Sequence, residues 1–249
     1  MKVGTDGVLL GALADLNQII GSWHDNAIGN RCVRVLDIGT GTGLIALMMA
    51  QRLNDIGIPD FGIDAVEIDH EAALQAEENF AASAWSKKMT VHEMPFEQFA
   101  NNASDSDDAH QYDLIVSNPP FYNATLKPED RSRAVARHKD SLPLSQIMHF
   151  AGTHLTQHGR IGLIYPTAYD QEVMFEASIS GLMPRRRINI LTKTGKPCKR
   201  VITEFSRISS QGESQTADVV NETVSLRNAD GDYSDEYRNL TDDFYLYLR

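Results

Sequence analysis

The feature that most constrains the fold of this chain is a regular alternation of short apolar runs, rich in β-branched residues, with helical stretches. Each run is long enough for one strand, and most are followed by a helix-length segment. The expected strands are 33–38, 63–68, 89–92, 112–117 and 160–165, and the expected helices are 44–53, 71–84, 143–156 and 169–179. Such alternation with right-handed crossovers predicts a doubly wound α/β fold with a mostly parallel sheet.

Two more strands are expected near 187–192 and 200–206, and no helix separates them. Strands joined by a short turn pair antiparallel, because a parallel neighbour requires a long crossover. The run 112–117 is apolar throughout, which is typical of a strand covered on both faces. We therefore predict a Rossmann-like sheet of seven strands, mostly parallel, with an antiparallel strand at its edge.

The chain shows no internal repeat and no linker rich in proline or glycine, so we predict a single domain over residues 1–249. Its composition, 42% hydrophobic and 23% charged, is globular, and no apolar run approaches the ~20 residues of a membrane-spanning helix. Cys32 and Cys198 are not in a metal-ligand spacing, so we expect neither a disulfide nor a bound metal. With no secretory signal at the start, we expect a cytoplasmic protein, and a monomer.

The first expected strand and helix are separated by a glycine-rich turn, Asp37-Ile38-Gly39-Thr40-Gly41-Thr42-Gly43. Glycines at a strand end let backbone amides approach a ligand closely, at the edge where open α/β sheets bind ligands. A dinucleotide fingerprint would require glycine at position 44, where this chain has Leu44. The acid before the glycines places Asp37 near a cationic or amino-bearing ligand. The alternative is a glycine turn that only eases the packing of helix on strand.

Glu67 stands at the end of the second expected strand, one βα unit after the glycine turn. An acid at this position typically accepts hydrogen bonds from ribose hydroxyls. A lone glutamate at a strand end is more often solvated, so the argument rests on its place after the turn. Together the glycine turn and Glu67 indicate a ribose-bearing cofactor, without saying which one.

The fourth expected strand is followed directly by Asn118-Pro119-Pro120-Phe121-Tyr122. As a bare pattern this is also compatible with a proline-stiffened turn. At the edge of the sheet it forms a rigid acceptor site, since the Asn118 side-chain oxygen and the Pro119 carbonyl can each accept one N–H of an exocyclic amine. Phe121 or Tyr122 offers a face on which an unstacked base packs. We therefore expect methylation of an amino nitrogen, with Asn118, Pro119, Pro120 and Phe121 as the catalytic motif.

These motifs resemble those of the class I methyltransferases that act on amino groups. Asp37–Gly43 is similar to their first motif, Val66–Asp69 to their second and Asn118–Phe121 to their fourth. Four segments resemble one family in particular, the bacterial tRNA1(Val) adenine-37 N6-methyltransferases: Lys2–Ala12, Pro119–Tyr122, Ala136–His138 and Tyr233–Tyr237. The likeness covers nearly the whole chain. It implies S-adenosylmethionine as cofactor and transfer of its methyl group to N6 of an adenine in the tRNA anticodon loop.

The resemblance also implies how the cofactor is held. Residues 1–31 would cover its pocket, and residues 210–249 would form a C-terminal extension packed on the body. Relatives often carry an aspartate after the third strand that caps the cofactor adenine, whereas this chain has Glu93-Met94-Pro95-Phe96. Either Glu93 takes that role, or Met94, Phe96 and backbone atoms hold the ring. The expected cofactor contacts are Thr5 and Asp6 near the methionine moiety, then Asp37, Gly39, Gly41, Gly43, Glu67, Ile68, Met94, Phe96 and Asn118.

The net charge of −11 argues against broad nucleic-acid binding, which depends on many Lys and Arg contacts to phosphates. The basic residues are nevertheless clustered, in 127–139, 185–187 and 193–200. The first cluster follows the Asn118 motif, so we expect tRNA contacts there, although an ordinary solvated loop fits equally well. The expected substrate contacts are Phe121, Tyr122, Lys127, Arg131, Arg133 and Arg137.

Several alternatives stay open at this point. The same motif serves methyltransferases that act on ribosomal RNA or on a protein glutamine side chain. The latter usually add an N-terminal helical domain, which we do not expect here because the first strand begins near Cys32. A DNA adenine methyltransferase would need a separate target-recognition region. A non-catalytic nucleoside- or RNA-binding module is less favoured because the acceptors at Asn118 are intact.

Overall fold

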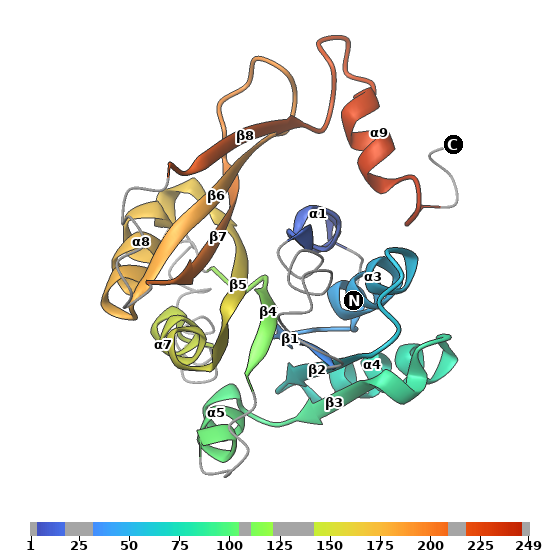
Figure 1. The fold of residues 1–249 in the computed structure, drawn as a ribbon. Helices are drawn as coiled ribbons and strands as arrows, with labels where there is room; N and C mark the ends of the chain where they lie inside the picture. The colour runs from blue at the N-terminus through green and yellow to red at the C-terminus, as the bar shows by residue number, and fades with distance from the viewer. Residues whose placement is uncertain (1–3, 18–31, 105–110, 122–141, 209–217, 246–249) are drawn as a thin grey trace, which may run out of the picture.

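The computed structural model describes residues 4–17, 32–104, 111–121, 142–208 and 218–245, and the statements below concern these residues. They contain a mixed sheet of eight strands in the order β3-β2-β1-β4-β5-β7-β6-β8 (Figure 1). The strands are β1 (Val33–Ile38), β2 (Phe61–Glu67), β3 (Met89–Glu93), β4 (Tyr112–Ser117), β5 (Leu155–Pro166), β6 (Leu182–Leu191), β7 (Arg200–Arg207) and β8 (Val220–Ser225). The helices are α1 (Thr5–Leu13), α3 (Leu44–Asp55), α4 (His70–Ala82), α5 (Phe96–Ser104), α7 (Leu144–His154), α8 (Asp170–Ile179) and α9 (Asp235–Thr241), with short 3-10 turns η1 (Ser86–Lys88) and η2 (Thr167–Tyr169).

The first five strands are mutually parallel, and each pairs with its neighbours in the order that a doubly wound sheet requires. β7 runs antiparallel to both β5 and β6. The predicted α/β fold with a mostly parallel sheet is confirmed, and so is the antiparallel pairing of the two strands that no helix separates.

The structure differs from the predicted sheet in two details. The sheet has eight strands rather than seven, and the antiparallel strand β7 lies between β5 and β6 rather than at the edge. The edge is formed by β8, which pairs in parallel with β6. Only Val224 of β8 is buried. An edge strand that packs few side chains needs little apolar sequence, so its pattern does not stand out.

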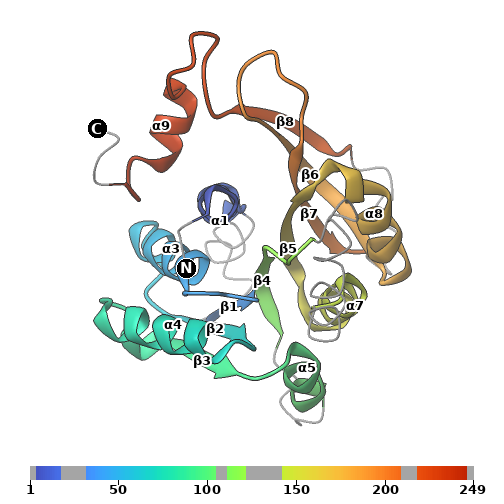
Figure 2. The same ribbon diagram turned by 180° about the vertical axis from the view of Figure 1, so that it is seen from behind.

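Helices cover both faces of the sheet. α1, α3 and α4 lie on one face, and α5, α7 and α8 lie on the other (Figures 1 and 2). The first face buries a cluster that includes Leu9, Met49 and Ile63, and the second buries one that includes Phe150 and Tyr165. All six residues of β4 are buried, as predicted for a strand covered on both faces.

The sequence does not predict α1, which lies along α3 in close contact with it. A Cβ on Gly7 would lie 3.5 Å from Leu44, and one on Gly11 would overlap the Met48 sulfur at 2.5 Å. The Arg52 guanidinium donates to the Gly11 carbonyl at 2.9 Å, near the C-terminal end of α1. These contacts place the first turn of α1 beside the start of α3, next to the glycine turn.

β8 and α9 come from the C-terminal residues, and α9 is anchored by one aromatic side chain. Tyr237 is 4% exposed and belongs to the core cluster that also contains Leu9. Ser234 caps α9, accepting a hydrogen bond from the Tyr237 amide at 3.0 Å. The division into a covering segment, a body and an extension stays a prediction. No helix among the described residues is long and apolar enough to cross a membrane.

Candidate active site

The predicted motifs meet at one edge of the sheet. β1 and β4 are in register at Ile38 and Ser117, and β1 and β2 are in register at Ile38 and Val66. These strand ends are followed by the glycine turn, by Asn118 and by Glu67. Because parallel strands end at the same edge, three motifs that are far apart in the sequence become neighbours.

The glycine turn has a backbone that only glycine adopts readily. Gly39, Gly41 and Gly43 have φ angles of 71°, 60° and 82°. The Gly39 amide donates to the Val66 carbonyl at 2.9 Å, which fastens the turn to β2. A Cβ on Gly43 would lie 2.5 Å from Cε1 of Phe80 on α4. At Gly43 the turn therefore also permits close packing of α4.

Asp37 is fully buried beneath the turn. Its Oδ2 accepts hydrogen bonds from the Thr40 hydroxyl at 2.6 Å and from the Ala46 amide at 3.1 Å, while Oδ1 is buried without a hydrogen-bond partner among the described residues. Burial raises the pKa of Asp37 to about 7. These contacts make Asp37 a residue that joins the turn to α3. Its expected contact with an amino-bearing ligand stays a prediction.

Glu67 is half-buried and holds the turn from the β2 side. Its Oε2 accepts from the Gly41 amide at 2.8 Å, and its Oε1 accepts from the Ile68 and Asp69 amides at 2.9 Å each. A carboxylate offers about four acceptor positions, so about one remains free. Accepting both hydroxyls of a ribose would therefore require release of at least one backbone amide.

The apolar residues expected to contact the cofactor are divided between surface and core. Ile68 is 48% exposed. Met94 is half-buried, and its amide donates to the Glu67 carbonyl at 3.0 Å, which places both residues at the site edge. Phe96 is only 6% exposed, and its ring packs edge-on against Phe150 with centroids 5.3 Å apart. Phe96 is thus mainly a core residue, and its cofactor contact stays a prediction.

Glu93, the other candidate for the adenine amine, lies opposite Glu67 in the parallel register of β2 and β3. Its Oε1 is 2.9 Å from Nδ1 of His70, and both side chains are exposed. An exposed pair of this kind is easily exchanged for other partners. Both interpretations of the residues after β3 therefore stay open.

Asn118 follows β4 directly and is half-buried, with buried residues on either side. The Ser117 hydroxyl donates to the Ile38 carbonyl at 2.8 Å, which fixes the end of β4 against the end of β1. Within the described part of the chain, no side chain or backbone group hydrogen-bonds the Asn118 amide. The amide is therefore available to a substrate, on a backbone that Pro119 and Pro120 stiffen.

Phe121 packs against two tyrosines that follow or end β5. Its ring centroid lies 4.8 Å from that of Tyr169 and 6.1 Å from that of Tyr165. The Tyr165 hydroxyl is held by Thr203 at 2.7 Å and donates to Asp170 at 3.1 Å. Tyr169 was not expected from the sequence. The available signal is an aromatic residue just after the fifth strand, at the same sheet edge as Asn118.

The other expected substrate contacts, Tyr122, Lys127, Arg131, Arg133 and Arg137, lie outside the described residues. The basic run 185–187 is engaged within the fold. Each of its three arginines hydrogen-bonds a neighbouring side chain: Ser206, Glu222 and Asp170 in turn. These three arginines therefore stabilise the fold through side-chain partners on β7, β8 and α8.

The first turn of α1 reaches the same edge as Asn118. Asp6 Oδ2 accepts from Arg200 Nε at 3.0 Å, and Arg200 lies opposite Pro166, the last residue of β5. Thr5 is exposed. Thr5 and Asp6 therefore lie at the carboxyl edge, between the start of α3 and the end of β5.

A cavity of about 460 Å³ lies elsewhere, between the C-terminal ends of α1 and α3 and the residues after α9. Its lining includes Leu16, Arg52 and Phe244 and none of the expected site residues. The converging strand ends, which carry the chemistry, define the candidate site instead. The described residues contain no group of three or more His, Cys, Asp or Glu side chains placed to hold a metal ion.

The fold has counterparts among solved structures. A predicted O-methyltransferase from Agrobacterium tumefaciens matches over 98% of both chains, with a TM-score of 0.59 and 15% identity. A Listeria monocytogenes protein described as a class I S-adenosylmethionine-dependent methyltransferase matches over 90% of this chain and 68% of its own, with a TM-score of 0.54 and 13% identity. Likenesses at such low identity establish the fold alone. The chain has the class I methyltransferase fold.

Sequence comparison identifies the family within this class. Residues 26–182 match the family model of the methyltransferase small domain. Two proteins named tRNA1(Val) (adenine(37)-N6)-methyltransferase, from Photorhabdus laumondii and Bacteroides thetaiotaomicron, are each 37% identical to it; they match 99% and 100% of this chain and 89% and 92% of their own length. The chain belongs to the tRNA1(Val) (adenine(37)-N6)-methyltransferase family, as its motifs predicted.

Proposed function

We propose that this protein transfers a methyl group from S-adenosylmethionine to N6 of adenine 37 in tRNA1(Val). The observation that carries the proposal is the position of Asn118, which the register of β1 and β4 places beside the glycine turn. Full-length relatives at 37% identity, named for this reaction, support the choice of substrate.

The residues at the sheet edge fit a nucleoside cofactor. The three glycines of the turn carry no side chains and let a ligand approach the backbone closely, and Glu67 supplies carboxylate oxygens at the end of β2 for a ribose. Ile68 and Met94 offer apolar contacts for an adenine beside it. Thr5 and Asp6, on the first turn of α1, are the candidates for the methionine end. S-adenosylmethionine supplies a methyl group bound to a positively charged sulfur.

Asn118 and Pro119 would act on the amine that receives the methyl group. Adenine N6 is a weak nucleophile because its lone pair is delocalised into the ring. Acceptance of its two N–H bonds, by the Asn118 side-chain oxygen and the Pro119 carbonyl, favours a tetrahedral nitrogen with a localised lone pair. Prolines hold both acceptors in place before the substrate arrives. No strong base is needed, since the methylated amine is acidic and loses its proton readily.

Phe121 would stack on the target adenine after that base has left its own stack. Its contact with Tyr169, at 4.8 Å between ring centroids and with the rings tilted by 48°, helps to fix the position of the Phe121 ring. Stacking on an aromatic side chain contributes about 1–3 kcal/mol per base. Tyr169 is thus proposed as a positioning residue for Phe121.

The test is to incubate the protein with labelled S-adenosylmethionine and one substrate at a time: tRNA, ribosomal RNA, or a release factor, which methyltransferases with the same motif modify on a glutamine side chain. Each reaction is then digested and the methylated product identified. We expect N6-methyladenosine in tRNA1(Val) and no label when adenine 37 is replaced by guanosine. Label in ribosomal RNA or in a glutamine side chain would reassign the substrate. RNA binding without any methylation would favour a non-catalytic module. A monomeric state and a cytoplasmic location stay predictions.

A further inference from the structure

The sheet edge that carries Asn118 differs in charge on its two sides. Towards β3, the strand ends and the residues just after them include four acids: Glu67, Asp69, Glu71 and Glu93. Beyond β5, the turn of residues 192–199 between β6 and β7 contains no acid and three lysines: Lys193, Lys196 and Lys199. We call residues 192–199 the lysine turn.

The lysine turn leaves the sheet at the same edge as Asn118. Arg200, which follows it, is in register with Pro166 at the end of β5 and with Ile190 near the end of β6. Only β5 separates β4 from β7 in the sheet. Ser117 is level with Thr203, so Arg200 lies three residues and Leu191 four residues further along the strand direction than the end of β4. With neighbouring strands ~4.8 Å apart and ~3.3 Å per residue, the turn begins about 20 Å from the end of β4 and returns to the sheet about 14 Å from it.

Hydrogen bonds fix the lysine turn on both of its sides. The Thr167 amide donates to the Lys199 carbonyl at 3.2 Å, and the Thr194 amide donates to the Arg227 carbonyl at 2.9 Å. The first bond joins the turn to η2, the same 3-10 turn that carries Tyr169. The lysine turn is therefore hydrogen-bonded to the same 3-10 turn whose Tyr169 contacts Phe121.

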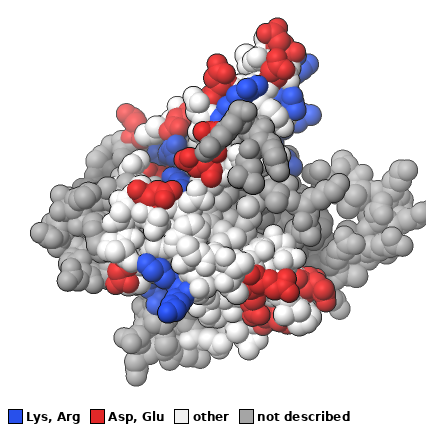
Figure 3. All heavy atoms as spheres, turned by 90° about the vertical axis from the view of Figure 1, so that its right-hand side faces the viewer, with Lys and Arg blue, Asp and Glu red and all other residues white. Residues whose placement is uncertain are grey.

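The ammonium groups of these lysines form no hydrogen bond or ion pair with the residues that the structure describes. Lys196 and Lys199 are exposed, and Lys193 is half-exposed. None of them forms an ion pair with a carboxylate of the described residues, whereas the adjacent Arg200 is paired with Asp6. Acids do lie nearby, since Figure 3 shows charges of both signs on the protruding top of the molecule, where Figure 1 places this turn and the one before α9.

Among the three lysines, Lys193 is the one near acidic residues. The turn after β8 carries Asp230 and Asp232, and the Cβ position of Gly231 between them lies 4.0 Å from Lys193 Nζ. The charge of Lys193 is therefore partly offset. Lys196 and Lys199 are the better probes of what the turn binds.

We propose that the lysine turn binds the phosphates of the RNA strand on either side of the target adenine. The inference rests on the proposed function and adds to it a surface for the substrate backbone. The turn lies about 14–20 Å from the end of β4, a distance spanned by the backbone phosphates that flank a base inserted beside Asn118. Lysine ammonium groups bind phosphates as point charges and release counterions from the nucleic acid. Such contacts set affinity and register without reading the sequence.

The test compares the full-length wild-type protein with K196Q, K199Q and the double variant K196Q/K199Q. The readouts are tRNA affinity over a series of salt concentrations, and KM and kcat for tRNA methylation. Each lysine should reduce the slope of log affinity against log salt by about 1, which at 0.1 M salt corresponds to on the order of tenfold weaker binding. KM for tRNA should rise accordingly, with kcat and the calorimetric affinity for S-adenosylmethionine unchanged.

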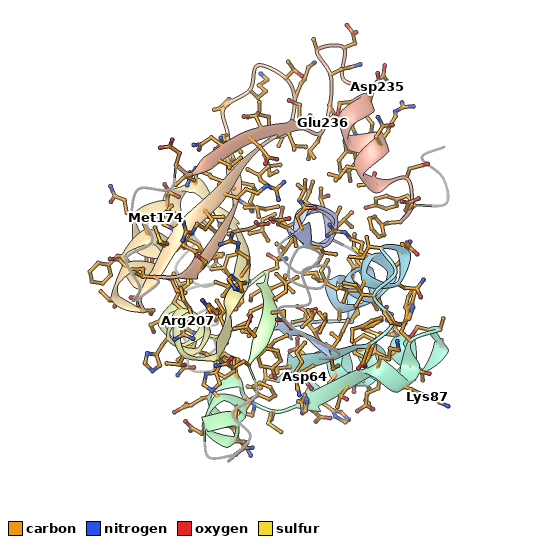
Figure 4. All side chains as sticks on the ribbon, viewed as in Figure 1. Asp64, Lys87, Met174, Arg207, Asp235 and Glu236 are labelled. Atoms are coloured by element: carbon orange, nitrogen blue, oxygen red, sulfur yellow. The ribbon has the colours of Figure 1, made fainter. Side chains whose placement is uncertain are left out.

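The matched control is K87Q. Lys87 is also exposed, but it lies in η1, which leads into β3 at the opposite edge of the sheet (Figure 4). K87Q should leave tRNA affinity and its salt slope unchanged. Wild-type methylation of tRNA with an unaltered slope and KM in K196Q/K199Q would overturn this inference and leave the proposed function intact. Lysine-dependent tRNA binding without methylation by the wild-type protein would support the surface and overturn the proposed function.

Discussion

Asp37 gives the glycine turn a pH-dependent stability. Its carboxyl is fully buried, with only Oδ2 hydrogen-bonded to described residues, through Thr40 and Ala46. Burial penalises the charged form and raises the pKa of Asp37 from 3.8 to about 7. Asp37→Asn keeps an oxygen that can accept both hydrogen bonds and removes the titration.

The direction follows from where the proton is bound. Between the two pKa values, 3.8 in the unfolded chain and about 7 in the folded protein, folding takes up one proton at Asp37. The stabilising contribution is therefore complete below about pH 4 and is lost as the pH rises through 7. A pKa difference of about 3 corresponds to ~4 kcal/mol in total, of which roughly 2.5 kcal/mol falls between pH 5 and pH 8.

Urea unfolding followed by circular dichroism at pH 5 and pH 8 measures this contribution of Asp37 to the free energy of unfolding. The stability of D37N relative to wild type should rise by roughly 2.5 kcal/mol from the lower to the higher pH. A constant cost of the new amide group cancels in that difference. Asp55→Asn, on an exposed aspartate, serves as the control and should show no comparable change. An equal offset of D37N from wild type at both pH values would refute the reasoning.

Three further predictions concern the motifs themselves. Asn118→Ala should keep cofactor affinity yet slow methyl transfer by on the order of 10²-fold, as for loss of a preorganised transition-state contact; near-normal turnover would remove Asn118 from the mechanism. Glu67→Ala should weaken S-adenosylmethionine binding in calorimetry by roughly 10- to 100-fold, since hydrogen bonds to charged groups contribute about 1.5–3 kcal/mol. Unchanged affinity would contradict the ribose assignment. Gly43→Ala should lower the free energy of unfolding by about 1–3 kcal/mol more than Gly57→Ala. Both glycines have positive φ, 82° and 78°, but only a Cβ on Gly43 overlaps Phe80; equal losses would show that packing against Phe80 does not matter.

The parts of the site that the sequence predicts are those determined by local chemistry. Gly39 and Gly41 adopt positive φ, and glycine is the residue that does so without strain. The spacing of these glycines in the sequence therefore predicts the turn. The apolar run of β4 indicates a buried strand, and Asn118 comes directly after it. The position of Asn118 at the sheet edge then follows from the βα alternation.

Other features depend on contacts between distant segments, and the sequence does not reveal them. β8 forms a strand because it pairs with β6, and because only one of its side chains is buried, its sequence shows little apolar pattern. α1 is mostly apolar and lies where Gly11 meets Met48. Tyr169 acquires meaning only through its contact with Phe121.

Asp37 marks the boundary between the two kinds of information. The sequence shows that Asp37 precedes the glycine turn, and from that position we expected it to contact a ligand. Burial is decided by everything that packs around a carboxyl, here both the turn and α3. The sequence by itself determined the order of strands and helices and the motifs at their ends, because these follow from neighbours along the chain. The tertiary structure decided which side chains are buried, paired or exposed, because these depend on residues that meet only after folding.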